Sequence, residues 1–156
     1  MVQYDYRCRF REIAVVVSSF QLQGKGWIGL VVDHPQSSSE VISLWLGRFL
    51  GPNDPLQVLT SNASSPTLGP PFPQALLQVE QEAFPLVISV RFDSGRAFLS
   101  ASSASATAST SQIVEGFPSN FSLLFTVETA SALSARLDSV HVLWEPPSCG
   151  LQGTVP

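Results

Sequence analysis

Glu80 and Glu82 are the only two carboxylates of the sequence that are separated by a single residue. On an extended strand their side chains would share one face about 7 Å apart, a separation compatible with the acid and base of an inverting glycosidase. Their neighbours Gln78 and Gln81 provide no aromatic surface for a sugar. A solvated strand edge is therefore the favoured interpretation, and the sequence predicts that the protein is not an enzyme.

The two histidines, His34 and His141, form no recognisable site with their sequence neighbours. Neither has a nearby cysteine or a second histidine that would complete a metal centre. The many serines leave a Ser-His-Asp triad open, but no Gly-x-Ser-x-Gly elbow supports one. The sequence thus contains no motif for nucleophilic or metal-dependent catalysis.

Carbohydrate recognition would need an exposed aromatic ring with polar side chains around it, and Trp27, Trp45 and Trp144 are the candidates. Each lies in an apolar run, which favours packing in the core. Trp27 is the least committed to the core, because it begins its run directly after a glycine-rich turn. Asp33 and His34, which close the same run, complete the set of candidate ligand-binding residues.

The two cysteines, Cys8 and Cys149, lie near opposite ends of the chain. If the terminal strands are neighbours, the two thiols come within reach of a disulfide, and closing so long a loop would contribute about 4–5 kcal/mol. The alternative is two unrelated thiols, with Cys8 a small core residue. The cysteine count alone does not fix the redox compartment.

Short extended segments must position all of these residues. Apolar and polar residues alternate with a period of two, and turn signals rich in Gly, Pro, Asp and Ser separate the segments. This pattern predicts an all-β protein, an antiparallel jelly-roll β-sandwich of about nine to twelve strands. One domain over 1–145 and an irregular tail over 146–156 are expected. The expected strands lie near 4–17, 27–32, 41–50, 56–59, 75–80, 85–92, 96–100, 101–111, 121–128 and 134–144.

The last extended run organises the chain. Val140, Val142 and Trp144 fall on one side of it, whereas Leu137 has the opposite parity. A bulge at Asp138–Ser139 would return Leu137 to the same core. The natural partner of this run is the first strand, so the two terminal strands are predicted to be adjacent.

The composition is unusual in its lack of charge. The chain is 44% hydrophobic but only 13% charged, about half the usual charged share. Either Ser, Thr and Gln solvate the surface, or another protein chain buries part of it. The formal charge of −4 argues against a nucleic-acid partner, because a nucleic-acid-binding protein would show a basic stripe on its surface.

Localisation is open. No apolar run has the length of a membrane-spanning helix, and the first residues lack the pattern of a signal peptide. The cytoplasm is the default compartment, and export is the alternative if a leader has been removed.

Five segments, in this order, resemble the concanavalin A-like (laminin-G-like) jelly rolls, which include carbohydrate-binding modules. They are Tyr6-Arg-Cys-Arg-Phe10, Gly24-Lys-Gly-Trp-Ile-Gly-Leu-Val-Val32, Ile42-Ser-Leu-Trp-Leu46, Val87-Ile-Ser-Val-Arg-Phe-Asp-Ser-Gly-Arg96 and Ala135-Arg-Leu-Asp-Ser-Val-His-Val142. The resemblance implies a fold more than a function. In that superfamily an aspartate such as Asp138 can belong to a structural calcium site, the one cofactor considered. Calcium takes six to eight oxygens and only one carboxylate is visible here, so a bulge capped by Asp138 is favoured.

Two functions remain as predictions. The first is a non-catalytic interaction or structural subunit of a larger protein complex, suggested by the low charge. The alternative is a carbohydrate-binding, lectin-like module with a glycan as ligand, suggested by the resemblance.

Overall fold

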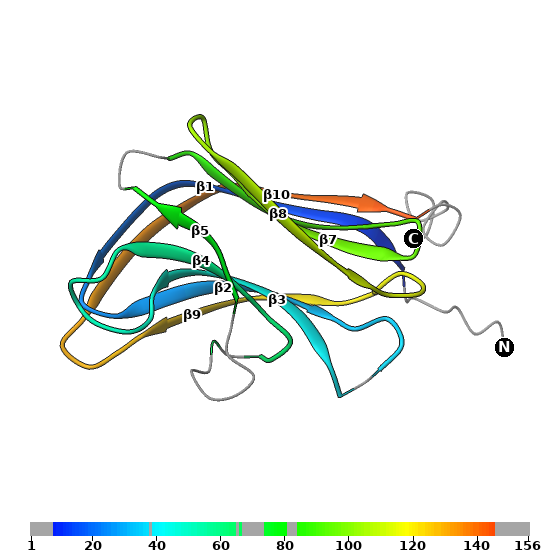
Figure 1. Cartoon of the computed structure of the whole chain (residues 1–156), viewed down its shortest axis with the longest axis horizontal. Coiled ribbons are helices and arrows are strands. Elements are labelled where there is room, and N and C mark those ends of the chain that lie inside the picture. The colour runs from blue at the N-terminus through cyan, green and yellow to red at the C-terminus, as the bar shows by residue number, and fades with distance from the viewer. Residues whose placement is uncertain (1–7, 38, 65, 67–73, 81–83, 146–156) are drawn as a thin grey trace, which may run out of the picture.

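In the computed structural model, the described residues are 8–37, 39–64, 66, 74–80 and 84–145, and they form ten strands and no helix. The strands build two antiparallel five-stranded sheets that pack face to face (Figure 1). The predicted all-β jelly-roll sandwich is thus confirmed. The strands are β1 (Phe10–Gln23), β2 (Gly26–Asp33), β3 (Val41–Arg48), β4 (Leu56–Ser61), β5 (Gln74–Val79), β6 (Leu86–Asp93), β7 (Arg96–Ser102), β8 (Thr107–Ile113), β9 (Phe121–Val127) and β10 (Ala132–Trp144).

Sheet A has the strand order β10-β1-β6-β7-β8, and sheet B has the order β5-β4-β3-β2-β9. β1 and β10, the first and last strands along the chain, pair along almost their whole length, as predicted. Ser139 lies opposite Val16 and Leu137 opposite Val17, so Asp138 is the extra residue of a bulge. Leu137 consequently packs against the core on the same side as Val142, and the predicted bulge is confirmed.

The main core lies between the sheets. The inward residues of β1 are buried and pack in one core cluster with those of β2, β3, β4 and β6; they are Phe10, Ile13, Val15, Val17, Phe20 and Leu22, and irregularities in the pairing with β10 interrupt their alternation. The Phe10 ring contacts Phe92 and Phe121 edge to face, at centroid distances of 6.4 and 5.8 Å, and so links the two sheets. Each fully buried aliphatic side chain contributes roughly 1.5–3 kcal/mol relative to an exposed one.

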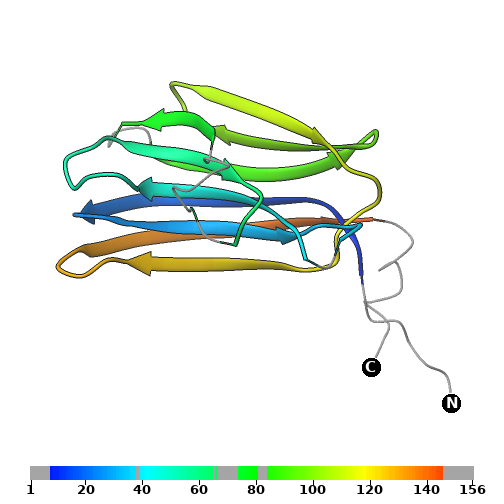
Figure 2. The ribbon, with the colours of Figure 1, turned by 60° about the horizontal axis from the view of Figure 1, so that its bottom comes forward.

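The sandwich is open along one side. The edge strands β9 and β10 belong to different sheets but lie next to each other on the same side of the molecule (Figure 2). The alternation in β9 predicts that every second residue faces the core, and Phe121 and Leu123 do pack against it. Phe125 and Val127, however, are 57% and 43% exposed, because no further strand covers them among the described residues. The alternation thus correctly predicts which side chains of β9 face the core, but the expectation that Phe125 and Val127 are buried is wrong.

None of the described residues forms a helix of the length and apolarity needed to cross a membrane.

Candidate functional site

The outer face of sheet B carries a second apolar cluster, separate from the main core. Its buried members are Val31, Trp45, Phe49 and Leu59, because β2 and β3 are apolar on both faces. Trp45 is only 1% exposed. It is therefore a packing residue, in agreement with the interpretation favoured from sequence.

Hydrogen bonds fix Trp45 in this cluster. Its indole Nε1 donates to Ser43 Oγ at 3.0 Å. The Ser43 hydroxyl in turn lies 2.8 Å from the backbone carbonyl oxygens of Ser61, the last residue of β4, and of Ala63 just after it. The chain that leaves β4 is thus tied to the outer face of sheet B.

Trp27 lies at the margin of this cluster and is only half-buried. Its ring stacks on Phe49 with a centroid distance of 5.6 Å and an interplanar angle of 25°. In the strand register Trp27 lies opposite Thr126 of β9 on one side and Gly47 of β3 on the other. Of the three tryptophans, Trp27 thus combines partial exposure with a fixed ring on a sheet face.

The register continues from Gly47 to Gln57 of β4 and on to Gln78 of β5. The result is a line of side chains across sheet B, which we call the Trp27 row: Thr126, Trp27, Gly47, Gln57 and Gln78. A Cβ atom at Gly47 would lie 2.1 Å from the Gly26 carbonyl oxygen, so only glycine fits there. The row therefore presents an indole, a bare backbone position, a hydroxyl and two amides, without any ionisable group.

Asp33 and His34 lie at the opposite end of β2. Asp33 lies six positions along the chain from Trp27, which corresponds to about 20 Å along a strand. The structure therefore does not bring these predicted ligand-binding residues together with Trp27. Asp33 is exposed, and its backbone N–H donates to the Asn120 carbonyl oxygen at 3.1 Å.

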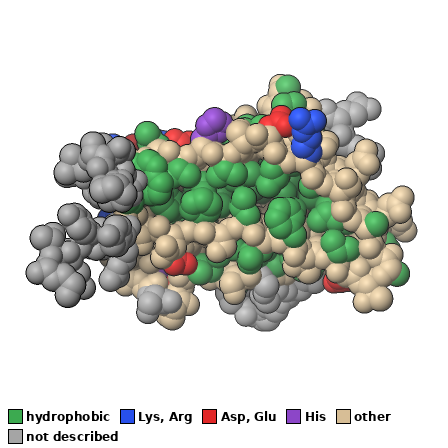
Figure 3. All heavy atoms as spheres, turned by 180° about the vertical axis from the view of Figure 1, so that it is seen from behind, with side chains coloured by type: hydrophobic (Ala, Val, Ile, Leu, Met, Phe, Trp, Pro, Cys, Tyr) green, Lys and Arg blue, Asp and Glu red, His purple; other side chains and the backbone are tan. Residues whose placement is uncertain are grey.

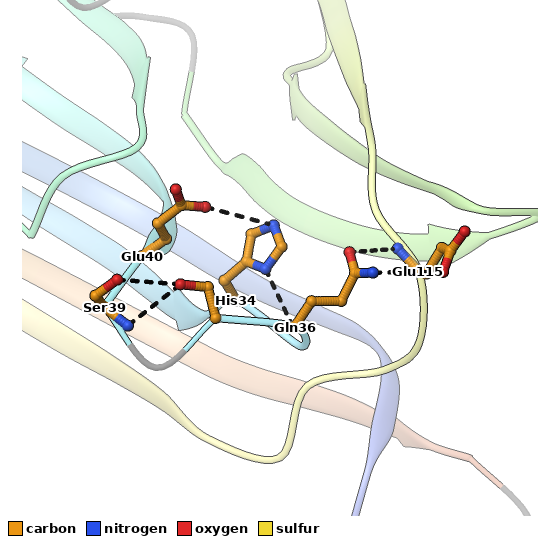
Figure 4. A network of polar contacts seen from close by, with 6 residues as sticks. His34, Gln36, Ser39, Glu40 and Glu115 are labelled. Atoms are coloured by element: carbon orange, nitrogen blue, oxygen red, sulfur yellow. Dashed lines mark hydrogen bonds and ion pairs between the residues drawn. The ribbon is translucent and has the colours of Figure 1, made fainter.

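His34 belongs to a polar network that joins two connections of the sandwich (Figure 4). Its Nδ1 accepts the backbone N–H of Gln36 at 3.1 Å, and its Nε2 lies 4.0 Å from the Glu40 carboxylate. The Gln36 side-chain oxygen accepts the backbone N–H of Glu115 at 3.0 Å. These contacts hold the β2–β3 connection against the segment after β8, which is a structural role.

Asp138 lies at the bulge of β10 and forms an ion pair with Arg136, with 3.2 Å between Oδ1 and Nε. Among the described residues, no group of three or more acidic, histidine or cysteine side chains is placed to hold a metal ion. The structural calcium ion suggested by the family resemblance stays a prediction.

Cys8 is buried and is not a free thiol. Its predicted partner Cys149 lies outside the described residues, as does the predicted tail, so this disulfide pairing also stays a prediction.

A cleft of about 240 Å³ lies beside β5, where Glu80 is exposed at the end of the strand. Gln78, Glu80, Ser103 and Ser105 provide its polar lining. Glu82 lies outside the described residues, so the predicted spacing of the two carboxylates is not tested.

Trp144 is 41% exposed and contacts Phe10 edge to face at 6.3 Å. It belongs to the open side of the sandwich rather than to either sheet face. The hydroxyl and amide partners of Trp27 were missed at the level of sequence. Only the register of β9, β2, β3 and β4 reveals them, and no single-strand pattern encodes that register.

No protein-family model matches the sequence, and no curated protein matches it. Two solved structures share the fold. A galectin from the ball sponge Cinachyrella sp., described as tetrameric, is 13% identical, and the match covers 90% of this chain and 96% of the galectin with a TM-score of 0.52. Scytalido-glutamic peptidase, solved with a peptide-based transition-state analogue, is 8% identical over 85% of this chain and 71% of the peptidase, with a TM-score of 0.50. At such identities the likeness shows a shared fold alone.

The prediction that the protein is not an enzyme is contradicted by the peptidase, because the peptidase shares this fold and is an enzyme. The prediction depended on the absence from the sequence of motifs that are typical of glycosidases and serine hydrolases. A fold does not fix its chemistry, which depends on a few side chains placed on the scaffold. The two structures support a jelly-roll β-sandwich and do not show the concanavalin A-like family.

Proposed function

We propose that the protein is a carbohydrate-binding β-sandwich domain whose sugar site is the Trp27 row. The observation that carries the proposal is the partly exposed Trp27, whose ring is held by its stack on Phe49 and lies in a row with hydrogen-bonding side chains. Membership of the concanavalin A-like superfamily belongs to the same proposal.

The chemistry of the row suits a neutral sugar. One face of a sugar ring carries C–H groups that pack on an aromatic ring, while the hydroxyls at its rim need hydrogen-bond partners. Gln57 supplies an amide with both donors and an acceptor, and Thr126 supplies a hydroxyl on the other side of the indole. Gly47, between Trp27 and Gln57 in the row, adds no side chain of its own, because a Cβ atom there would lie 2.1 Å from the Gly26 carbonyl oxygen. The row contains no ionisable side chain, so it favours uncharged glycans over acidic ones.

Two further points support the proposal. The Phe49 stack holds the indole in one orientation, and preorganisation of this kind lowers the entropic cost of binding. The likeness to a galectin covers nearly the whole of both chains, which is consistent with a lectin-like role.

Binding to an array of neutral and acidic glycans tests the proposal. We expect the native protein to bind neutral glycans, and Trp27→Ala to weaken that binding at least about tenfold. Gln57→Ala should have a smaller effect. Phe98→Ala is the matched control, because it removes a half-buried aromatic from the outer face of sheet A. Absence of any neutral-glycan binding, or binding that Trp27→Ala leaves intact in a folded protein, would overturn the proposal.

An interaction role in a protein complex is a second candidate. The comparisons do not support it, but the exposed apolar residues of the open side favour it. Apolar residues that gather on one side of a small domain are typical of interaction sites.

A further inference from the structure

The open side is a strip of core-type residues that no layer covers within the part of the chain that the structure describes. Phe125 and Val127 of β9 are 57% and 43% exposed, and Val140 and Trp144 of β10 are 39% and 41% exposed. Their partners in the register are buried: Val140 lies opposite Val15, which is 0% exposed. Seen from this side, the apolar band runs along much of the molecule (Figure 3). The strip therefore has the chemistry of a core and the exposure of a surface.

The two strands that border the strip also have unpaired backbone edges. Among the described residues, β10 pairs only with β1, and β9 pairs only with β2. Natural edge strands are usually protected by charges, proline, bulges or shortness. β9 contains no charged residue and no proline, and the 13-residue β10 has one bulge and two oppositely charged residues. These edges are therefore weakly protected against pairing with another chain.

A second copy of the chain fits this side better than other occupants. A lipid would leave the backbone edges unpaired, and a single peptide strand would extend only one of the two sheets. A second copy carries the same two edges at the same separation. A two-fold axis perpendicular to the sheets would place β10 against β10 and β9 against β9, both antiparallel, so that both sheets continue and the strips cover each other.

The charges on β10 are self-complementary for this arrangement. Arg136 and Asp138 are exposed, lie on either side of Leu137 and face the same way, as their 3.2 Å ion pair shows. In an antiparallel pairing centred on Leu137, Arg136 of one copy lies opposite Asp138 of the other. The two charged residues of the edge thus favour this pairing instead of blocking it.

We propose that the open side is the interface of a symmetric homodimer in which both sheets continue across the two-fold axis. This proposal is independent of the sugar site. It rests on the second candidate function, the interaction role, and it names a second copy of the chain as the partner.

Sedimentation equilibrium of the full chain over a wide concentration range tests the proposal. We expect a monomer–dimer equilibrium, and at least about tenfold weaker association for Phe125→Asp and for Val140→Asp. Ile113→Asp is the matched control, because Ile113 is 76% exposed on β8, the opposite edge of sheet A. It should dimerise like the native protein.

A charge exchange tests the register. Arg136→Asp alone should weaken the dimer, and the exchange of Arg136→Asp with Asp138→Arg should restore it. A loss of association that the exchange does not restore overturns the pairing about Leu137. Equal association for Ile113→Asp and Phe125→Asp overturns the interface.

If the protein is a monomer, binding of the dye 1-anilinonaphthalene-8-sulfonate shows whether the apolar strip is exposed or covered. A monomer that binds the dye, with the binding lost in Phe125→Asp, overturns the homodimer and leaves the interaction role standing. A monomer that binds no dye overturns both, because the strip is then covered within the chain itself.

Discussion

Substitution of Gly29 by alanine tests the packing that builds the outer face of sheet B. A Cβ atom at Gly29 would lie 2.1 Å from Cζ3 and 2.3 Å from Cε3 of Trp45. Carbon atoms in contact normally lie about 3.5–4.0 Å apart, so the ring or the strand has to move by more than ~1 Å. The indole has little freedom to move, because it is 1% exposed and its Nε1 is bonded to Ser43.

The magnitude follows from two opposing terms. Overpacking of a tightly packed cluster costs about 1–3 kcal/mol. Replacing glycine inside a strand returns about 0.5–1 kcal/mol, because alanine loses less backbone entropy on folding. We therefore expect Gly29→Ala to lower the free energy of unfolding by about 1–2 kcal/mol, measured by urea denaturation followed by far-UV circular dichroism.

Two comparisons make this prediction refutable. At Gly51 the nearest atom to an added Cβ is the Asp54 carboxylate oxygen at 3.3 Å, which can swing away, so Gly51→Ala should change the stability by less than about 0.5 kcal/mol. Trp45→Phe removes the ring atoms that clash with the added Cβ atom. The double variant with Gly29→Ala should therefore lose about 1 kcal/mol less stability than the two single variants lose together. A Gly29→Ala protein of native stability, or strict additivity, would refute the packing described here.

Three further changes have defined outcomes. Ser89 is 9% exposed and its hydroxyl lies 2.6 Å from that of Ser100, so Ser100→Ala should cost about 1–2 kcal/mol of stability in urea denaturation, and adding Ser89→Ala should restore most of it. Arg48 donates to three backbone carbonyl oxygens, so Arg48→Lys should cost about 1–2 kcal/mol in the same assay, and native stability would contradict the importance of the guanidinium geometry. Alkylation of the unreduced protein followed by intact-mass measurement should find neither Cys8 nor Cys149 modified, and reduction should lower the stability by about 4 kcal/mol; a labelled thiol would contradict the pairing.

The arrangement of the terminal strands was predictable because it depends on parity, which a sequence displays directly. Val140 and Leu137 cannot share a core on a regular strand, and only an extra residue near Asp138 reconciles them. The structure has that residue between the pairs Val16–Ser139 and Val17–Leu137. Wherever a local pattern alone decided the outcome, sequence reasoning was sufficient.

The candidate site and the open side were not predictable, because both depend on neighbours that are distant in sequence. The indole of Trp27 acquires Thr126 through the pairing of β2 with β9, and Gln57 through the pairings of β2 with β3 and of β3 with β4. A shift of one residue in any of these pairings would replace one of the two neighbours. Phe125 has the same parity and hydrophobicity as Leu123, yet Leu123 packs against the core while Phe125 is exposed. What differs is the burial that other parts of the structure give to each residue, and no property of β9 itself records that.

The scarcity of charge has two different physical origins on two faces of the molecule. On the outer face of sheet A, hydroxyls stand in for charges: Ser102 and Thr107 bond across β7 and β8 at 2.9 Å, and water can solvate this surface without a partner. On the open side the uncharged residues are apolar, and water solvates them only at a cost in free energy. The two explanations drawn from the composition are therefore not exclusive. Sheet A accounts for its share of the missing charge by itself, whereas the open side leaves a free-energy gain available to whatever covers it. Substituting Phe125 by aspartate should consequently improve the solubility of the protein, and the same change at Ile113, which stands alone, should alter it little.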